Sequence, residues 1–195
     1  MSYKFVFLPP SGERTRYLAD AMTTAVPDLE VVHCESREQA LSALTDARAC
    51  FGTLDPELLA AAAKLEWLAA PAAGPAKGFY FPELIASNVV ATNFRGIFND
   101  HISAHIMAFV LAFSRGMHMY FRDQFEAHWR PGGESSPATH LPESTALIIG
   151  VGGIGAETAL QCKNWGMKTV GIDPRIKEAP TGVDELLGPD ALDKL

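Results

Sequence analysis

A short glycine-rich turn between a predicted strand and a predicted helix constrains the fold of this chain more than any other feature. The turn reads Gly150-Val-Gly152-Gly153-Ile154-Gly155 and matches the pattern G-x-G-x-x-G. In such a turn the first glycine permits a tight bend, the second lets a ligand approach the backbone, and the third lets the helix pack on the strand. Free N–H groups at the start of the helix then favour a pyrophosphate.

The segments around the turn meet further requirements of a dinucleotide-binding unit. An apolar strand is predicted over residues 146–149, a helix over 154–165, and a second strand over 168–172. A third strand is predicted over 183–187. An ordinary α/β domain with a glycine-rich turn is the alternative interpretation, but it does not require this strand, turn and helix order.

The second predicted strand ends at Asp173, 18 residues after Gly155. This is close to the spacing of about 20 residues expected for the acid that binds the adenine ribose. A carboxylate there accepts hydrogen bonds from ribose hydroxyls and repels a 2′-phosphate, which favours NAD and makes NADP the less favoured cofactor. Arg175 either contacts the nucleotide or is a solvated surface side chain.

Strands and helices also alternate through the first half of the chain, which predicts a parallel sheet covered on both faces. The predicted strands span residues 3–8, 30–34, 49–52, 65–69 and 89–91, and predicted helices span 15–25 and 36–44 and begin again at Asp55. One long helix with an apolar face is predicted over 100–129, and it would extend about 40 Å, far enough to connect two domains.

Composition excludes several classes of function. The net charge of -7 and the absence of a Lys/Arg stripe argue against a nucleic-acid partner. No run approaches the roughly 20 apolar residues of a membrane span, and the first apolar run is too short for a signal peptide.

Cysteine and histidine spacing gives no metal site. Cys34, Cys50 and Cys162 fit neither a zinc site nor a disulfide framework, which favours a reducing cytoplasm, and Cys162 is expected in a core. His101 and His105 lie four residues apart without a third ligand at a supporting spacing, so packing is the preferred interpretation.

From about Leu65 onward the sequence resembles the D-isomer-specific 2-hydroxyacid dehydrogenase family in four stretches. Residues 65–74 (LEWLAAPAAG) resemble its substrate loop, and residues 91–96 (ATNFRG) resemble the segment before its interdomain helix. Residues 100–105 (DHISAH) resemble the start of that helix, and residues 150–173 resemble its cofactor motif.

The resemblance implies an α/β fold with two domains. Residues 1–99 would form a flavodoxin-like substrate domain, and residues 100–195 part of a Rossmann domain with a doubly wound parallel sheet, entered through the long helix. It further implies that Ala73, Gly74 and Asn93 bind a small 2-hydroxy or 2-oxo acid, and that the interdomain helix contributes to a homodimer.

In this family the catalytic Arg, Glu and His come later in the cofactor domain than Leu195, so no catalytic residue is assigned here. The chain is therefore expected to be an amino-terminal portion, inactive by itself, of an oxidoreductase that interconverts a D-2-hydroxy acid and a 2-oxo acid with NAD(H). The alternative is a truncated, non-catalytic dehydrogenase-like protein that binds a nucleotide or an interaction partner. Both alternatives predict association, because unpaired sheet edges need a partner.

Overall fold

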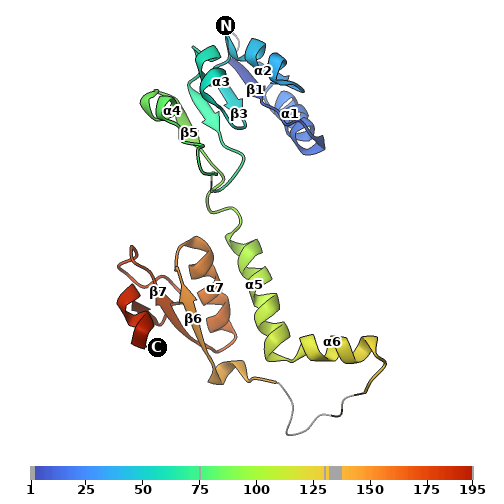
Figure 1. The fold of residues 1–195 in the computed structure, drawn as a ribbon, viewed down its shortest axis with the longest axis vertical. Coiled ribbons are helices and arrows are strands. Elements are labelled where there is room, and N and C mark those ends of the chain that lie inside the picture. The colour runs from blue at the N-terminus through green and yellow to red at the C-terminus, as the bar shows by residue number, and fades with distance from the viewer. Residues whose placement is uncertain (1–2, 75, 130, 132–137, 195) are drawn as a thin grey trace. The chain divides into compact units, whose positions relative to one another are not determined.

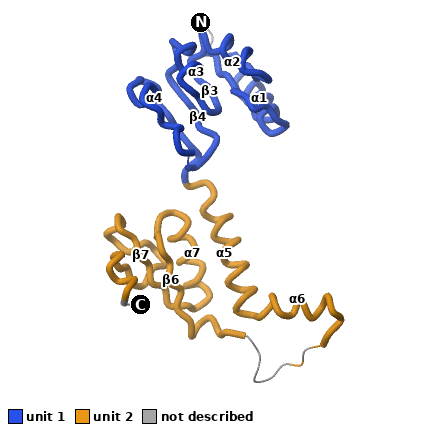
Figure 2. The backbone as a smooth tube through the Cα atoms, viewed as in Figure 1, with its two compact units in different colours: residues 1–95 blue, residues 96–195 orange. Residues whose placement is uncertain are grey.

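The structure is a computed structural model that describes residues 3–74, 76–129, 131 and 138–194 (Figure 1). The chain divides into two compact units, Met1–Arg95 and Gly96–Leu195 (Figure 2). This division falls four residues before the domain boundary predicted after residue 99. Each unit contains its own parallel sheet, as the alternation of strands and helices predicts.

The first unit contains a five-stranded parallel sheet in the order β2-β1-β3-β4-β5, which is the flavodoxin-like order. Its strands are β1 (Tyr3–Phe7), β2 (Leu29–His33), β3 (Ala49–Phe51), β4 (Trp67–Ala69) and β5 (Val90–Thr92). Its helices are α1 (Glu13–Ala25), α2 (Arg37–Leu44), α3 (Pro56–Ala61) and α4 (Pro82–Ala86).

Alternating side chains of β1 build the two layers on this sheet. Phe5 and Phe7 pack with Ala19 of α1 on one face. Val6 belongs to the other face, where its cluster includes Leu44 of α2 as well as residues of α3 and α4. Both faces of the first strand are therefore buried, which explains its continuous apolar sequence.

Side-chain caps fix where two of these helices begin. The Ser36 hydroxyl accepts a hydrogen bond from the Gln39 N–H at 3.3 Å, and α2 follows. The Asp55 carboxylate accepts one from the Leu58 N–H at 2.9 Å, and Pro56 occupies the first turn of α3. Both caps satisfy donors that the helix itself leaves free.

The second unit contains a three-stranded parallel sheet in the order β6-β7-β8. Its strands are β6 (Thr145–Ile149), β7 (Lys168–Ile172) and β8 (Glu185–Leu187). Its helices are α5 (Asn99–Ser114), α6 (Met117–Phe125) and α7 (Gly153–Asn164), with short 3-10 helices η1 (Leu141–Glu143) and η2 (Pro189–Lys194). The third predicted strand thus forms, although it is shorter than predicted.

Helix α5 packs lengthwise on α7. The Ser103 hydroxyl, fully buried, accepts a hydrogen bond from the Gln161 side-chain amide at 2.8 Å. One helical turn further along, the thiol of Cys162 lies 3.6 Å from the sulfur of Met107. Cys162 is buried, which confirms its expected place in a core.

The prediction of one continuous helix over residues 100–129 is wrong. Helix α5 ends at Ser114 and α6 begins at Met117, because Gly116 adopts a left-handed conformation with φ of 65°. A single glycine without Cβ takes this conformation at little cost, and it redirects the chain. No helix among the described residues is both long enough and apolar enough to cross a membrane.

We expect Gly52→Ala to destabilise the first unit by roughly 1–3 kcal/mol, because Gly52 has a φ of +142° and a Cβ there would lie 2.7 Å from Leu8 Cβ. Urea unfolding followed through the NMR signals of β1 and β3 measures the effect. Gly74→Ala is the control, since its Cβ would meet nothing within 4 Å. Equal midpoints for the two variants would contradict the expectation.

Candidate functional site

The glycine turn lies between β6 and α7 in the second unit, at the carboxyl end of its sheet (Figure 1). Gly150 follows β6 with a φ of +90°, which favours glycine. A Cβ on Gly155 would overlap the carbonyl oxygen of Gly150. At Gly153 a Cβ would come within 2.6 Å of the Asn99 side chain. The turn itself therefore requires glycine at positions 150 and 155, whereas the end of the flexible Asn99 side chain can move aside for a Cβ at position 153.

Gly152 is different, because the fold does not require glycine there. It caps α7 with a φ of -66°, and a Cβ on it would meet nothing within 4 Å. Gly153, Ile154 and Gly155 form the first turn of α7, whose N–H groups have no carbonyl partner inside the helix. Ile154 is partly exposed beside them. Open space thus lies in front of free donors at the positive end of a helix dipole.

Asp173 follows β7 and joins the glycine turn through its carboxylate. One oxygen, Oδ2, accepts a hydrogen bond from the Val151 N–H at 3.2 Å. The other, Oδ1, accepts hydrogen bonds from the N–H groups of Arg175 at 2.8 Å and Ile176 at 3.1 Å. These donors, that of Arg175 first, lower the pKa of Asp173 below its ordinary value. The structure therefore brings Asp173 to the predicted turn, and only 6% of the residue is exposed.

A cavity of about 270 Å³ opens beside Asp173. Its lining includes residues absent from the sequence prediction, namely Lys177, Leu187, Gly188 and Pro189. The sequence could have indicated the residues at and after Leu187. The third predicted strand of this unit ends at Leu187, and parallel strands end at the same edge of a sheet, where Asp173 also lies. Arg175 is exposed on the turn that leads into this cavity.

The predicted substrate residues lie in the first unit. The side-chain amide of Asn93, just after β5, donates a hydrogen bond to the carbonyl oxygen of Ala73 at 2.9 Å. Ala73 and Gly74 are exposed in the loop after β4. The structure therefore brings Asn93 to the loop, and there it holds the backbone.

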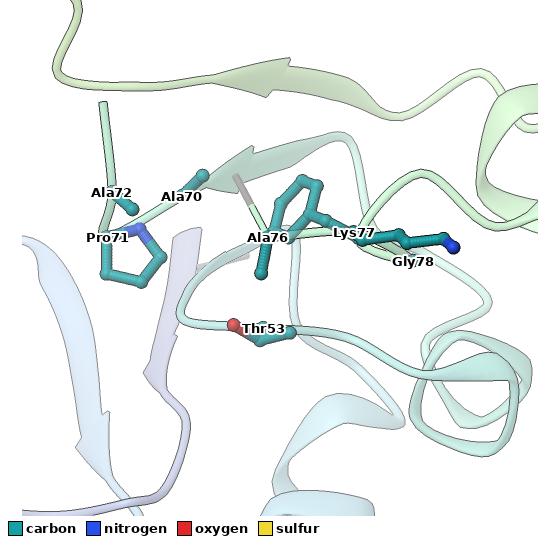
Figure 3. Close-up of a pocket in the computed structure, with 8 residues that line it drawn as sticks. Thr53, Ala70, Pro71, Ala72, Ala76, Lys77 and Gly78 are labelled. Carbon is teal, nitrogen blue, oxygen red and sulfur yellow. The ribbon is translucent and has the colours of Figure 1, made fainter. Parts of the chain in front are cut away.

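Next to this loop a cavity of about 330 Å³ is lined mainly by apolar groups (Figure 3). Thr53, which directly follows the predicted third strand, and the buried Phe79 line it. Thr53 was not predicted from the sequence, although it could have been found from its place at a strand end; for Phe79 the sequence leaves open whether it lines a cleft or packs under the loop. The Lys77 side chain extends away from Thr53 (Figure 3).

The remaining residues with metal-binding or nucleophilic side chains lie apart. Over the part of the chain that the structure describes, no three His, Cys, Asp or Glu side chains are grouped to hold a metal ion. His105 packs edge-on against Phe109, with 5.0 Å between the ring centroids. Burial raises the pKa of the Cys50 thiol to about 12, which disfavours the reactive thiolate.

Several solved structures share this fold. A D-isomer specific 2-hydroxyacid dehydrogenase family protein from Aeromonas salmonicida has 24% identity and a TM-score of 0.76, over 100% of this chain and 60% of that chain. One from Xanthobacter autotrophicus, in complex with NADPH and MES, has 21% identity and a TM-score of 0.75, over 100% of this chain and 60% of that chain. The D-lactate dehydrogenase from Aquifex aeolicus, complexed with NAD and lactic acid, has 16% identity and a TM-score of 0.71, over 95% of this chain and 55% of that chain.

The chain thus spans about 55–60% of the length of these structures. No curated protein matches the chain. Residues 107–195 match the sequence profile of the D-isomer specific 2-hydroxyacid dehydrogenase, NAD binding domain. The predicted family resemblance is thereby confirmed for residues 107–195, which are similar to the NAD-binding domain of the D-isomer specific 2-hydroxyacid dehydrogenases, and the α/β fold with a Rossmann-like unit is confirmed for the chain.

Proposed function

We propose that this chain binds NAD(H) at its second unit and belongs to an oxidoreductase that interconverts a D-2-hydroxy acid and a 2-oxo acid. The observation that supports this most directly is the open space at Gly152, in front of the free N–H groups of α7. The fold explains the other two glycines of the G-x-G-x-x-G pattern, Gly150 and Gly155, but not this one. A pyrophosphate that must approach the backbone closely does explain it.

The cofactor would be held by two features of the second unit. The N–H groups of Gly152, Gly153 and Ile154 would bind the pyrophosphate, and the ionised Asp173 would face the adenine ribose. The bound dinucleotide supplies the hydride acceptor or donor, and the protein orients it. The residues assigned here hold the nucleotide and the substrate carboxylate, and none of them is assigned to move the substrate proton, so the proposal for this chain is binding.

On the first unit, the proposed substrate site is the loop that contains Ala73 and Gly74. Backbone N–H groups of such a loop can bind a carboxylate, and the hydrogen bond from Asn93 to the Ala73 carbonyl fixes the loop's shape. The neighbour complexed with NAD and lactic acid supports a small 2-hydroxy acid as the class of substrate. The proposed compartment is the cytoplasm, because all three cysteines are free and buried.

A homodimer is also proposed, through the exposed apolar side chains of α5 and α6. They recur every four or seven residues, so each helix carries them on one face. They are Ile102, Phe109, Phe113, Met117, Phe121 and Phe125. Large apolar groups with this exposure are typical of interaction surfaces, and a second copy offers a complementary apolar face by symmetry.

We expect Gly152→Ala to weaken NADH binding at least roughly tenfold, because the added methyl group occupies the space of the pyrophosphate. Isothermal titration of the chain with NADH measures the dissociation constant. Gly12→Ala is the matched control, since Gly12 also caps a helix and also has nothing within 4 Å of its Cβ position. Both variants should lose a similar stability, about 1 kcal/mol. Unchanged NADH affinity in Gly152→Ala would contradict the proposed site.

Acid should remove the stabilisation that Asp173 provides. Because the pKa of Asp173 is lower in the folded chain, the unfolded chain binds the proton more readily. The stabilisation is full above about pH 4 and is lost as the pH falls through the folded pKa. We therefore expect Asp173→Asn to destabilise the second unit at pH 7, and the difference from the unaltered chain to shrink at pH 3.

Urea unfolding followed through the NMR signals of β6 and β7 at both pH values measures this difference. Glu178→Gln is the control, because Glu178 is exposed and close to Asp173 in sequence. A difference that stays constant between pH 7 and pH 3 would show that the carboxylate charge is not what stabilises the turn.

We expect Phe113→Glu to dissociate the proposed dimer. Phe113 is 59% exposed and is one of the middle members of this set of apolar side chains, and a glutamate that the dimer buried there would have no partner for its charge. Analytical ultracentrifugation at several concentrations gives the mass. Tyr17→Glu, on the 71% exposed Tyr17 of α1, is the control and should leave the dimer intact. A monomer for the unaltered chain would overturn this proposal.

A further inference from the structure

Asn99, the first residue of α5, packs its side chain against the glycine turn. The Nδ2, Oδ1 and Cγ atoms of its amide group lie 2.6, 2.9 and 3.0 Å from the position that a Cβ on Gly153 would take. Because all three atoms lie at nearly the same distance from this point, the flat face of the amide group is turned toward Gly153. Its N–H bonds lie in the amide plane, so they run along the first turn of α7 instead of pointing into it.

Helices α5 and α7 lie side by side and run in the same direction (Figure 1). Asn99 lies beside Gly153 at the start of both helices, and further along both helices Met107 lies beside Cys162. The amino-terminal ends of the two helices therefore adjoin. A side chain on the first turn of α5 thus lies next to the N–H groups that α7 leaves without a carbonyl partner.

The amide group of Asn99 has no hydrogen-bond partner among the residues that the structure describes. The side chain is half-buried, and it offers two N–H donors. Gly152, where the open space lies, directly precedes Gly153, and consecutive Cα atoms are about 3.8 Å apart. The donors of Asn99 are therefore within reach of a group that is bound in this space.

The same contact accounts for a glycine that the motif does not require. Position 153 is one of the variable positions of G-x-G-x-x-G, and the φ of Gly153 is not positive. A larger residue there would push the amide group of Asn99 aside. Glycine at position 153 therefore keeps this amide group at the start of α7.

From these contacts we propose that the side-chain amide of Asn99 donates a hydrogen bond to the pyrophosphate of the bound dinucleotide, and that Gly153 leaves room for it. The inference rests on the proposed function, because it assumes that a pyrophosphate lies at Gly152. It adds a side chain from a second helix to the backbone donors of α7. A bound dinucleotide would then connect the start of α5 to the start of α7.

The test compares dissociation constants of the full chain for three ligands. NADH and ADP-ribose both contain the pyrophosphate and are measured by isothermal titration, whereas adenosine has no phosphate and is measured by NMR titration. The variants are Asn99→Ala, the isosteric Asn99→Asp, Gly153→Ala, and the double variant that combines the two alanines. Asn164→Asp is the matched control, because Asn164 is exposed at the opposite end of α7 and the change in charge is the same.

We expect Asn99→Ala to weaken the binding of NADH and ADP-ribose roughly tenfold, and Asn99→Asp to weaken it more, because a carboxylate repels the pyrophosphate. Adenosine affinity should change less than about twofold in both variants. An acid in the first turn of a helix is favourable, so Asn99→Asp should lose affinity without losing stability, as thermal unfolding would show. Asn164→Asp should bind all three ligands as the unaltered chain does.

Gly153→Ala should weaken the binding of NADH and ADP-ribose about as much as Asn99→Ala does. The double variant should lose no further affinity, because both substitutions remove the same contact. Losses that add in the double variant would show that Gly153 does not act through Asn99, and this would overturn that part of the proposal.

Two other results would overturn the inference while leaving the proposed function intact. One is unchanged affinity of Asn99→Asp for NADH and ADP-ribose. The other is an equal loss for adenosine, which would mean that the substitution disturbs the whole site instead of one contact with the pyrophosphate. If neither NADH nor ADP-ribose bound the unaltered chain, the proposed function itself would fail, and this inference with it.

Discussion

The hydrogen bond between the Val151 N–H and the Asp173 carboxylate holds together the end of the second unit where the glycine turn lies. It connects the loop after β6 to the loop after β7, and the other carboxylate oxygen organises the turn through Ile176. Removal of this one side chain would leave three N–H groups without their acceptor. The shape of the glycine turn and the direction of the next turn depend on it, and so does the cavity that Asp173 and this next turn line together with the end of β8.

The glycines of the turn have separate physical causes, although they form one motif. Gly150 is required by its positive φ, and Gly155 by the carbonyl oxygen that a Cβ would overlap. Gly152 has neither constraint, and the proposed close approach of a pyrophosphate would account for it. A motif of this kind therefore records two demands, one from folding and one from a ligand, and only a structure separates them.

Much of this fold could be predicted because its signals are local. Apolar runs and caps such as Asp55-Pro56 predicted the strands and several helix starts to within a few residues. Other features escaped, and two of them show why. The break at Gly116 lies inside an unbroken apolar periodicity, and one glycine in a helical pattern does not reveal which conformation it takes. The cavity beside Asp173 needs the end of β8, which is distant in sequence and reaches the site only through strand pairing.

Each unit has its own hydrophobic clusters, which are built around Leu44 and Phe7 in the first unit and around Met107 and Val151 in the second. A ligand stabilises only the cooperative structure that binds it, by an amount set by its concentration relative to its dissociation constant. A dinucleotide on the glycine turn would therefore slow amide exchange in β6, β7 and α7 and leave β1 to β5 unchanged. A single melting temperature would miss this effect whenever the first unit unfolds earlier, whereas residue-by-residue protection would also locate the ligand.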